Sequence, residues 1–334
     1  INDPEAVLTL CRESPDRIHD LEKWGANFKK TEDGRINQRY FGAQSFRRTC
    51  FVGDQTGKAV LNASIDEAKR LGVPYRQNIY ITKILTDDTG VVGAMGVDLD
   101  RGQLVVIRAR AVVLAAGGHT SVYKRSSSRP DENTGDAQAL ALDAGATLRD
   151  MEMVQFHPTG RVWPEDEAGH LVTEAVRGEG GRLFNTEGER FMQRYSPEQM
   201  ELDARDVVAR ANYREIHEGR GTERGAVLLD ISHRDADYIK DRLPQMYEMH
   251  LKDGVDITKE PMEVAPTAHY AMGGIVVDFK TGATAVPGLY AVGEATCGVH
   301  GANRLGGNSL AEIFVFGKVV GAHLVESLTE HPLR

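Results

Sequence analysis

Hydrophobic residues recur at helical spacing near the start of the chain and at strand spacing after it. Apolar side chains about 3.6 positions apart predict helices over 4–24 and 56–71. Shorter apolar segments, separated by Asp-Thr-Gly and Asp-Arg-Gly turns, predict a meander of strands over 78–87, 90–98 and 104–108. The first third of the chain should therefore combine helices with an antiparallel sheet.

A continuous apolar run over 111–116 precedes Gly117-Gly118 and predicts a strand buried on both faces. Glycines directly after such a strand let a ligand approach the backbone. A turn and a helix are expected over 133–145, and a strand that ends at a glycine and an acid over 288–294. Taken together, these strand ends suggest a bound cofactor, although ordinary packing explains each one taken singly.

The character of the sequence changes between residues 161 and 264. Charged residues and helical spacing dominate this segment, which predicts helices over 196–218 and 238–251. A short buried strand is expected between them, over 226–230.

Glycine-rich, strand-like sequence returns at residue 265, with a strand expected over 274–278 and a largely apolar helix over 310–324. We therefore expect an α/β (α+β) fold in which one domain is interrupted by another. The outer domain would comprise residues 1–160 and 265–334, and the inserted domain residues 161–264.

The composition of the 334 residues is that of a soluble globular protein, with 41% hydrophobic and 27% charged residues. A formal net charge of -9 argues against a nucleic-acid partner, which requires a basic surface. The three cysteines, Cys11, Cys50 and Cys297, form no Cys-x-x-Cys pair, so neither a disulfide framework nor a metal site is expected. We also expect no transmembrane segment and no signal peptide.

The two ends of the chain predict an internal piece of a longer polypeptide. A helical pattern begins within a few residues of Ile1 without an initiator methionine, and the last helix runs almost to Arg334. The phosphate-binding Gly-x-Gly-x-x-Gly unit of dinucleotide-binding folds does not occur in the sequence. We expect that unit to precede Ile1.

Several charged residues stand at turns and helix starts, where each has an ordinary structural explanation. Glu174 and Arg177 are three positions apart, on one face of a helical turn. Arg304 lies in a glycine-rich stretch before a helix, whose N-terminus favours anions. Together, Arg205, Arg304 and one histidine could hold two carboxylates, because arginine binds carboxylate through two parallel hydrogen bonds. Glu174 and Arg177 would then remain as a proton relay.

The motifs that contain these residues resemble those of one family, the flavoprotein subunit of succinate dehydrogenase and fumarate reductase. The resemblance extends from about Arg47 to Gly317. The segments that carry it are Arg47-Arg48-Thr49, Thr134-Gly135-Asp136, Gln155-Phe156-His157-Pro158-Thr159-Gly160, Thr173 to Gly180, Ala204-Arg205-Asp206, Pro266-Thr267-Ala268-His269-Tyr270 and His300 to Leu310.

The resemblance implies roles for individual residues around an FAD cofactor. Arg205 would be the general acid or base, with Glu174 and Arg177 as its proton path. The dicarboxylate would be bound by His157, Leu171, Thr173, His269 and Arg304. FAD would be contacted by Ala116, Gly117, Asp136, Glu294, Asn308, Ser309 and Leu310, and residues 161–264 would form a capping domain. No metal is implied in this chain.

The resemblance also implies partners and leaves alternatives open. The subunit would oxidise succinate to fumarate, or catalyse the reverse, and exchange electrons with an iron–sulfur subunit and quinone. Membrane anchor subunits would hold it peripherally at the cytoplasmic face of a prokaryotic membrane. L-aspartate oxidase shares most of the site, and a soluble fumarate reductase would need no iron–sulfur partner. An inactive assembly module is the alternative from another class.

The sequence predicts that residues 1–334 alone bind FAD poorly and are inactive. The phosphate-binding unit, the histidine that tethers FAD in many members and the helical C-terminal domain of that family are absent from these residues. Purification of this span followed by the visible absorbance of oxidised flavin tests the prediction. Flavin retained in one-to-one ratio with protein would contradict it.

Overall fold

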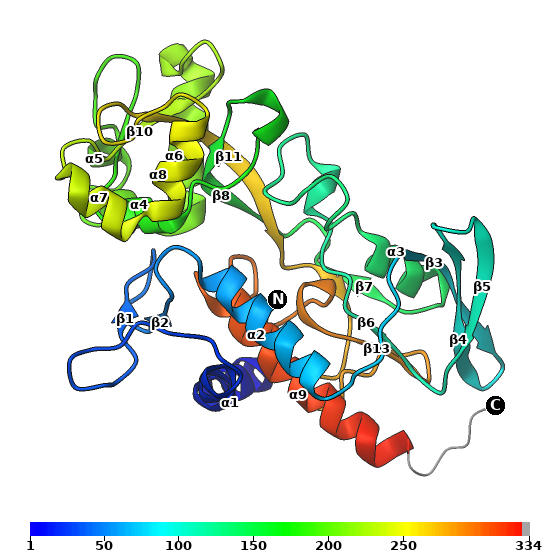
Figure 1. Ribbon diagram of the computed structural model, residues 1–334. Coiled ribbons are helices and arrows are strands. Elements are labelled where there is room, and N and C mark those ends of the chain that lie inside the picture. The colour runs from blue at the N-terminus through cyan, green and yellow to red at the C-terminus, as the bar shows by residue number, and fades with distance from the viewer. Residues whose placement is uncertain (329–334) are drawn as a thin grey trace.

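A computed structural model describes residues 1–328 of the chain. Figure 1 shows three groups of elements arranged around a central pair of long strands. A compact, largely helical lobe lies at upper left, a group of long helices lies below it, and a strand meander lies at the right. The mixed helix and strand fold agrees with the α/β (α+β) class expected from the sequence.

The lower group of helices confirms the predicted helical segments at both ends of the chain. It contains α1 (Pro4–Lys23), α2 (Thr56–Arg70) and α9 (Asn308–Leu328). The Asp3 carboxylate accepts hydrogen bonds from the first backbone N–H groups of α1, which fixes where this helix begins. Its apolar face packs against α9, with Leu10 and Phe316 in one buried cluster.

The predicted meander is also confirmed. It consists of β3 (Ile79–Asp87), β4 (Gly90–Asp98) and β5 (Gln103–Arg108), paired antiparallel in that order. Gly90 has a φ of +121°, and a Cβ there would lie 2.3 Å from the Pro287 carbonyl oxygen. Only glycine therefore fits where the meander meets the rest of the fold.

The run before Gly117-Gly118 forms a strand, but it is not buried on both faces as expected. Strand β6 (Val112–Leu114) pairs in parallel with β13 (Leu289–Ala291). Within residues 1–328 β6 has no second neighbour in the sheet, so Val113 keeps 38% of its surface exposed. Helix α3 (Asp136–Asp143) covers the pair through alanines with no exposed surface. A further short sheet joins β7 (Leu148–Arg149) to β12 (Gly274–Ile275), which is shorter than the predicted strand over 274–278.

The central strands form a four-stranded antiparallel sheet that the sequence pattern predicted only in part. Its order is β8 (Val154–Arg161), β11 (Met262–Ala271), β10 (Val227–Asp230) and β9 (Arg182–Phe184). The expected domain boundaries after residues 160 and 264 fall inside β8 and β11, which pair with each other. The sheet is thus continuous from one expected domain into the other.

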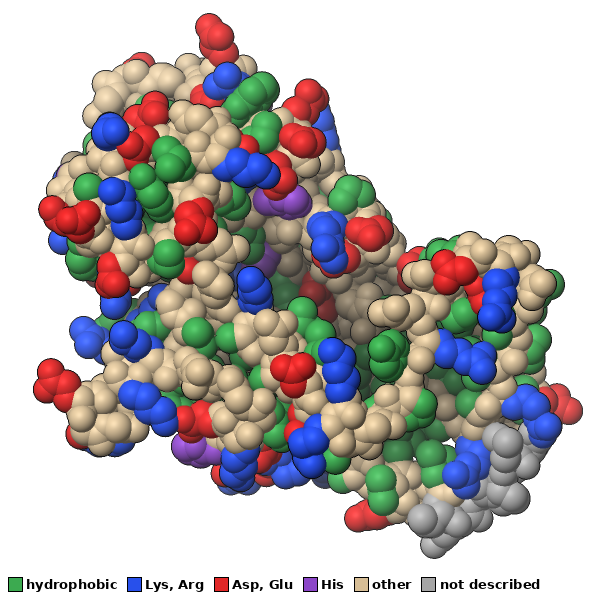
Figure 2. Space-filling model, viewed as in Figure 1, with side chains coloured by type: hydrophobic (Ala, Val, Ile, Leu, Met, Phe, Trp, Pro, Cys, Tyr) green, Lys and Arg blue, Asp and Glu red, His purple; other side chains and the backbone are tan. Residues whose placement is uncertain are grey.

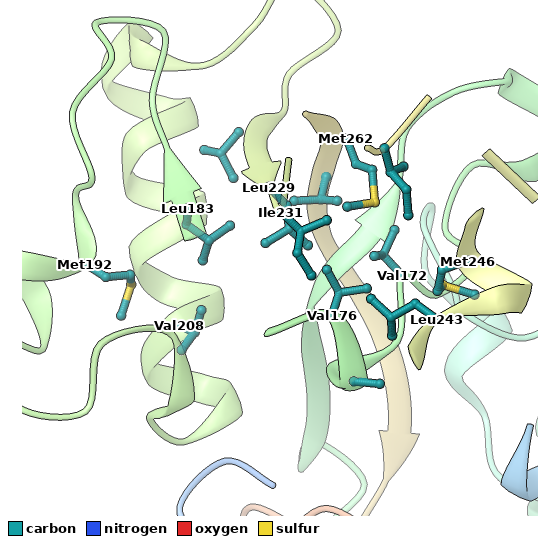
Figure 3. Packing of buried hydrophobic residues seen from close by; sticks show 14 of the residues in the cluster. Val172, Val176, Leu183, Met192, Val208, Leu229, Ile231, Leu243, Met246 and Met262 are labelled. Carbon is teal, nitrogen blue, oxygen red and sulfur yellow. The ribbon is translucent and has the colours of Figure 1, made fainter. Parts of the chain in front are cut away.

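The upper-left lobe is built around its own buried core (Figure 3). Side chains from β9, β10 and the surrounding helices fill it, including Val176, Leu229 and Leu243, which have no exposed surface. The helices of this lobe are α4 (Glu174–Gly178), α5 (Met192–Tyr195), α6 (Arg205–Glu215), α7 (Ala236–Arg242) and α8 (Pro244–Lys252). We call this lobe, residues 161–264, the cap.

Two predicted cap helices differ from the structure. The segment 196–218 is not one helix, because Met200 adopts a positive φ of 53° and α6 begins only at Arg205. The segment expected as a helix over 238–251 is split at Pro244. Leu243 leaves the helical region of backbone angles, as residues before proline commonly do.

Helix α9 is relevant to the expectation that the chain has no transmembrane segment. By length and composition α9 is apolar enough to cross a membrane, with a mean hydropathy of 1.2 over its best window. The core helix of a soluble protein passes the same test. Here α9 packs on α1 through Val315 and Phe316, but only 22% of that window is buried, and Ile313 and Val325 are exposed.

The packing of the cap core predicts the effect of a cavity. Leu229→Ala should destabilise the cap by about 3 kcal/mol, because a fully buried leucine leaves a void that the neighbouring strands fill only in part. Urea unfolding followed by circular dichroism measures the loss. Leu251→Ala is the matched control, because Leu251 is 46% exposed and should tolerate the change. Equal losses in both variants would contradict the assignment of this core.

Candidate active site

Strands β8 and β11 bring the two predicted site histidines together. His157 lies opposite Thr267 in the register, and the His157 and His269 rings have centroids 5.3 Å apart at 69°. The Thr159 backbone N–H donates to His157 Nδ1 at 3.3 Å, which places the proton of the neutral ring on Nε2. His269 Nδ1 lies 2.8 Å from the hydroxyl of Ser127. Desolvation and then the charge of Arg205 hold the pKa of both histidines well below 6.5, so both are neutral at pH 7.

The cap contributes a buried ion cluster at the starts of two helices. Glu174 begins α4 and Arg205 begins α6. Arg205 donates from Nε and Nη2 to Glu174 Oε2, at 3.0 and 2.7 Å. Arg177 Nη2 lies 3.9 Å from the same oxygen, one turn further along α4. Glu174, Arg177 and Arg205 expose at most 8% of their surfaces, so this is an interior cluster and not a solvated ion pair.

The Glu174 carboxylate stays ionised in this interior. Burial raises its pKa, but the charges of Arg205 and Arg177 outweigh burial, and the pKa falls to about 2. The Gly42 backbone N–H also donates to Glu174 Oε1, at 2.5 Å. Burial lowers the pKa of Arg177, whose Nε and Nη2 have no hydrogen-bond partner among residues 1–328. An arginine with unpaired buried N–H groups has capacity to hydrogen-bond a water or a substrate.

A glutamine joins the cap to the glycine-rich stretch that contains Arg304. Gln155 Oε1 accepts from Arg205 Nη1 at 3.0 Å and from Arg304 Nη2 at 3.1 Å. Its amide nitrogen donates to the Arg304 carbonyl oxygen and to Asn303 Oδ1, both at 2.6 Å. Burial and the nearby charge of Arg205 lower the pKa of Arg304 to about 10. Two buried guanidiniums therefore meet at one neutral oxygen.

The remaining predicted substrate residues border the same region. Residues 171–173 run along β8, where Leu171 bridges to Gly160 and the Val172 N–H donates to the Thr159 carbonyl oxygen. Thr173 Oγ1 is buried and has no hydrogen-bond partner. Figure 2 shows the surface hollowed between the cap, the lower helices and the meander. A small ligand with several acceptor atoms would satisfy unpaired donors such as the Thr173 hydroxyl and the Arg177 Nε and Nη2 groups.

The predicted cofactor residues lie at the ends of the parallel strands. Leu114 of β6 pairs with Ala291 of β13, so the turns after them, with Gly117 and Glu294, are adjacent. Glu294 Oε1 accepts from the Ala271 N–H at 2.9 Å, which ties this edge to β11. Burial raises the pKa of Glu294 to about 7. A Cβ at position 118 would lie 2.5 Å from Glu294 Oε1 and 2.9 Å from the Ala271 Cβ, so a larger residue there would displace the Glu294 carboxylate.

Helix α9 starts beside the same edge. A Cβ at Gly293 would lie 3.0 Å from the Ile313 side chain, so the Glu294 turn rests on the first turns of α9, which contain Asn308, Ser309 and Leu310. Asp136 begins α3 and accepts from the Thr134 hydroxyl at 2.9 Å. Ala116 is exposed.

Unpaired polar atoms next to these turns fit a polar cofactor such as FAD. His119 Nδ1 and Gln138 Oε1 are buried and have no hydrogen-bond partner. Gln138 spans the two strand ends, because its amide nitrogen lies near the Gly117 and Ala295 carbonyl oxygens. A ligand at this edge would find both donors and acceptors. Within residues 1–328, no group of three or more His, Cys, Asp or Glu side chains could hold a metal ion.

Four residues that the sequence did not indicate bond directly to predicted site residues or lie beside the cofactor edge. They are Gly42, Ser127, Gln155 and His119. Gln155 stands inside a motif of the family but had no predicted role. Gly42 is 132 positions from its partner Glu174 in the sequence, and Ser127 is 142 positions from His269. No local sequence pattern indicates contacts over such separations.

Comparison with known proteins finds close relatives over nearly the whole chain. The profile of the FAD binding domain family matches residues 1–310. A fumarate reductase (CoM/CoB) subunit of Methanothermobacter marburgensis is 52% identical over 96% of the chain. The succinate dehydrogenase flavoprotein subunit of Rickettsia conorii is 41% identical over 99%. The chain covers 58% and 59% of these two proteins.

A solved structure has the same fold. Quinol fumarate reductase of Escherichia coli matches 99% of the chain with a TM-score of 0.92 and 39% identity, and the chain covers 59% of it. The chain thus spans about three fifths of the length of each of these three relatives.

The depressed pKa of the histidines predicts how stability depends on pH. Below about pH 6.5 the unfolded chain takes up protons at His157 and His269, while the folded chain does not. Protonation of each histidine in the unfolded chain should therefore lower the free energy of unfolding by about 1.4 kcal/mol for every pH unit below about 6.5. Glu294 has the opposite effect on stability. Because its pKa is raised to about 7, the folded state binds this proton more tightly than the unfolded state between about pH 4.5 and pH 7. Glu294 therefore increases the free energy of unfolding as the pH falls through that range.

A difference measurement isolates one histidine. The unfolding free energy of the wild type and of His269→Gln would be compared at pH 7 and pH 5. The stability advantage of the wild type should shrink at pH 5, because the variant has lost one group that protonates on unfolding. An advantage that stays constant would show that His269 titrates normally in the folded protein.

Proposed function

The chain belongs to the FAD binding domain family, and on that basis we propose that it forms the catalytic part of a flavoprotein subunit that interconverts succinate and fumarate. Its relatives with fumarate reductase and succinate dehydrogenase names support this proposal. FAD is the cofactor of the family, and the residues at the strand ends described above are suited to hold it. L-aspartate oxidase and a soluble fumarate reductase are the alternative enzymes.

The observation that carries the proposal is the charge of the buried cluster. The guanidiniums of Arg177 and Arg205 lie against a single ionised carboxylate, that of Glu174, and the guanidinium of Arg304 is linked to this cluster only through the neutral Gln155 amide oxygen that it shares with Arg205. Two positive charges remain uncompensated among these groups in a site shielded from water. Buried charges are costly unless paired, and a dianion supplies the missing pair. A four-carbon dicarboxylate therefore suits the site better than aspartate, whose ammonium group would bring a further positive charge.

Substrate binding is assigned to residues from both sides of the hollow. Arg304 would form a bidentate pair with one carboxylate. His269, His157 and Thr173 would hydrogen-bond the carboxylates as neutral donors, and Leu171 would pack against the carbon chain. Because His157, His269 and Arg304 lie outside the cap and Thr173 lies in it, bound substrate would hold the cap against the rest of the molecule.

Proton transfer is assigned to Arg205 with Glu174 and Arg177 behind it. An arginine releases a proton only transiently, so it needs an adjacent group that restores its charge at once. Glu174 accepts hydrogen bonds from two nitrogens of Arg205 and lies next to Arg177. The three side chains would thus form a continuous path for a proton. The cation also stabilises negative charge that develops on the substrate carbon. FAD, when bound, supplies the acceptor or donor of the hydride.

The resemblance to the succinate dehydrogenase and fumarate reductase flavoprotein subunits supports partners, which are proposals for this chain. Electrons would pass to or from an iron–sulfur subunit and a quinone, with anchor subunits holding the complex at the cytoplasmic face of the membrane. The name of the Methanothermobacter relative indicates CoM and CoB as its reductants. An assay of this protein should therefore offer thiol coenzymes as well as a quinone.

Removal of the proton donor tests the proposal. Arg205→Ala in the full-length protein should lower kcat by roughly a thousandfold or more, with dicarboxylate binding largely kept. Steady-state kinetics with succinate and with fumarate measure the effect. Arg210→Ala is the matched control, because Arg210 lies on the same helix but its side chain is 71% exposed and, within residues 1–328, forms an ion pair only with Asp206. Near-normal turnover of Arg205→Ala would exclude Arg205 as the proton donor.

A further inference from the structure

Arg304 is supported differently from the other two arginines of the site. Within residues 1–328 it forms no ion pair, although only 3% of its surface is exposed. Its nitrogens donate to the Gln155 amide oxygen and weakly to the Leu305 carbonyl oxygen, and Nε has no partner. Its guanidinium also lies over the face of the Tyr270 ring, whose centroid is 4.4 Å from Cζ. The position of this cation therefore depends in part on what fixes the Tyr270 ring.

A buried carboxylate on α9 fixes that ring. The Tyr270 hydroxyl donates to Glu312 Oε2 at 2.5 Å. His300 Nε2 reaches the same oxygen at 2.8 Å, and the Tyr270 and His300 rings stand edge to face with centroids 5.4 Å apart. Glu312 is 2% exposed, so its carboxylate relies on these two donors in place of water. Rotation of the tyrosine would leave a buried acceptor short of one bond.

The carboxylate also acts on the electronic character of the ring. Burial and the charge of Glu312 raise the pKa of Tyr270 well above 10, so the phenol keeps its proton and remains a donor. A hydrogen bond to an anion polarises the phenol and makes the ring face more negative. A more negative face attracts the guanidinium above it more strongly. Glu312 thus influences both the position of Arg304 and the strength with which it is held.

We infer that Glu312 is a positioning residue for substrate binding, which holds the Arg304 guanidinium in place through the Tyr270 ring. The inference rests on the proposed function, in which Arg304 binds a substrate carboxylate. It also connects two parts of the site, because Glu312 lies on α9 one turn after Asn308, at the cofactor edge. His300 belongs to the same unit as the second donor to Glu312.

The test measures dicarboxylate affinity in the full-length holoenzyme. Malonate, a dicarboxylate that cannot be dehydrogenated, would be titrated while the flavin absorbance spectrum is recorded. Glu312→Gln keeps the shape of the side chain but removes its charge and one of its two acceptor oxygens. Its Kd for malonate should rise roughly tenfold, with kcat close to that of the wild type. Arg304 binds the ground state and the transition state alike, so its displacement should appear in KM and not in kcat.

A second variant keeps the inference testable if Glu312→Gln folds poorly. Tyr270→Phe retains the ring beneath Arg304 and removes only the hydroxyl, so it should weaken malonate binding in the same direction. The double variant should bind within about twofold of the weaker single variant, because both changes act through the same Tyr270–Glu312 hydrogen bond, one by removing its donor and the other by removing the charge of its acceptor. Wild-type affinity in both single variants, or effects that add in the double variant, would overturn the inference.

Two controls distinguish a positioning role of Glu312 from a purely structural one and from failure of the proposed function. Glu165→Gln makes the same chemical change at an exposed cap position and should leave Kd, flavin content and melting temperature unchanged. A merely structural role for Glu312 would lower the flavin content or melting temperature and leave the affinity of the folded fraction intact, which would contradict the inference. A wild-type holoenzyme that does not bind malonate would instead contradict the proposed function.

Discussion

The carboxylate of Glu174 is the interaction on which the site depends. It is buried, it stays ionised with a pKa of about 2, and it is the shared partner of Arg205, Arg177 and the Gly42 N–H. The buried guanidiniums of Arg205, at the start of α6, and Arg177, in the last turn of α4, are both stabilised by this nearby anion. The same carboxylate joins α4 to α6 within the cap and joins the cap to the loop after β1 (Gln38–Arg39). Geometry and charge of the site are thus fixed by one side chain.

The second half of the site is supplied by the long strand pair β8 and β11. Their register sets the two neutral histidines side by side, and Gln155 at the start of β8 separates the guanidiniums of Arg205 and Arg304. A neutral amide oxygen between two cations offsets part of their repulsion without cancelling their charge. The site therefore keeps its positive excess. This excess of positive charge lies next to a strand edge suited to a cofactor. The two features together support the proposed oxidation and reduction of a dicarboxylate.

The sequence predicted the parts of this structure that depend on local chemistry. Helices α1 and α2 and the meander have regular periodicity, and the charged site residues stand at turns or helix starts where sequence spacing implies proximity. The β8 and β11 strands were not predicted as a sheet because Pro158, Gly160 and the histidines interrupt their apolar pattern. The true start of α6 depends on the backbone of Met200, which no spacing reveals. Contacts such as those of Gly42 and Ser127 arise only when distant segments meet.

The most direct test of a site defined by buried charge is to remove one charge from the ligand instead of the protein. Calorimetric titration of the full-length holoenzyme with succinate and with butyrate compares two ligands of equal chain length that differ by one carboxylate. Because the buried guanidiniums of Arg177, Arg205 and Arg304 outnumber the one carboxylate in contact with them, succinate should bind at least roughly a hundredfold more tightly, which corresponds to about 3 kcal/mol. Equal affinity for the two ligands would contradict the claim that paired buried charges define the substrate.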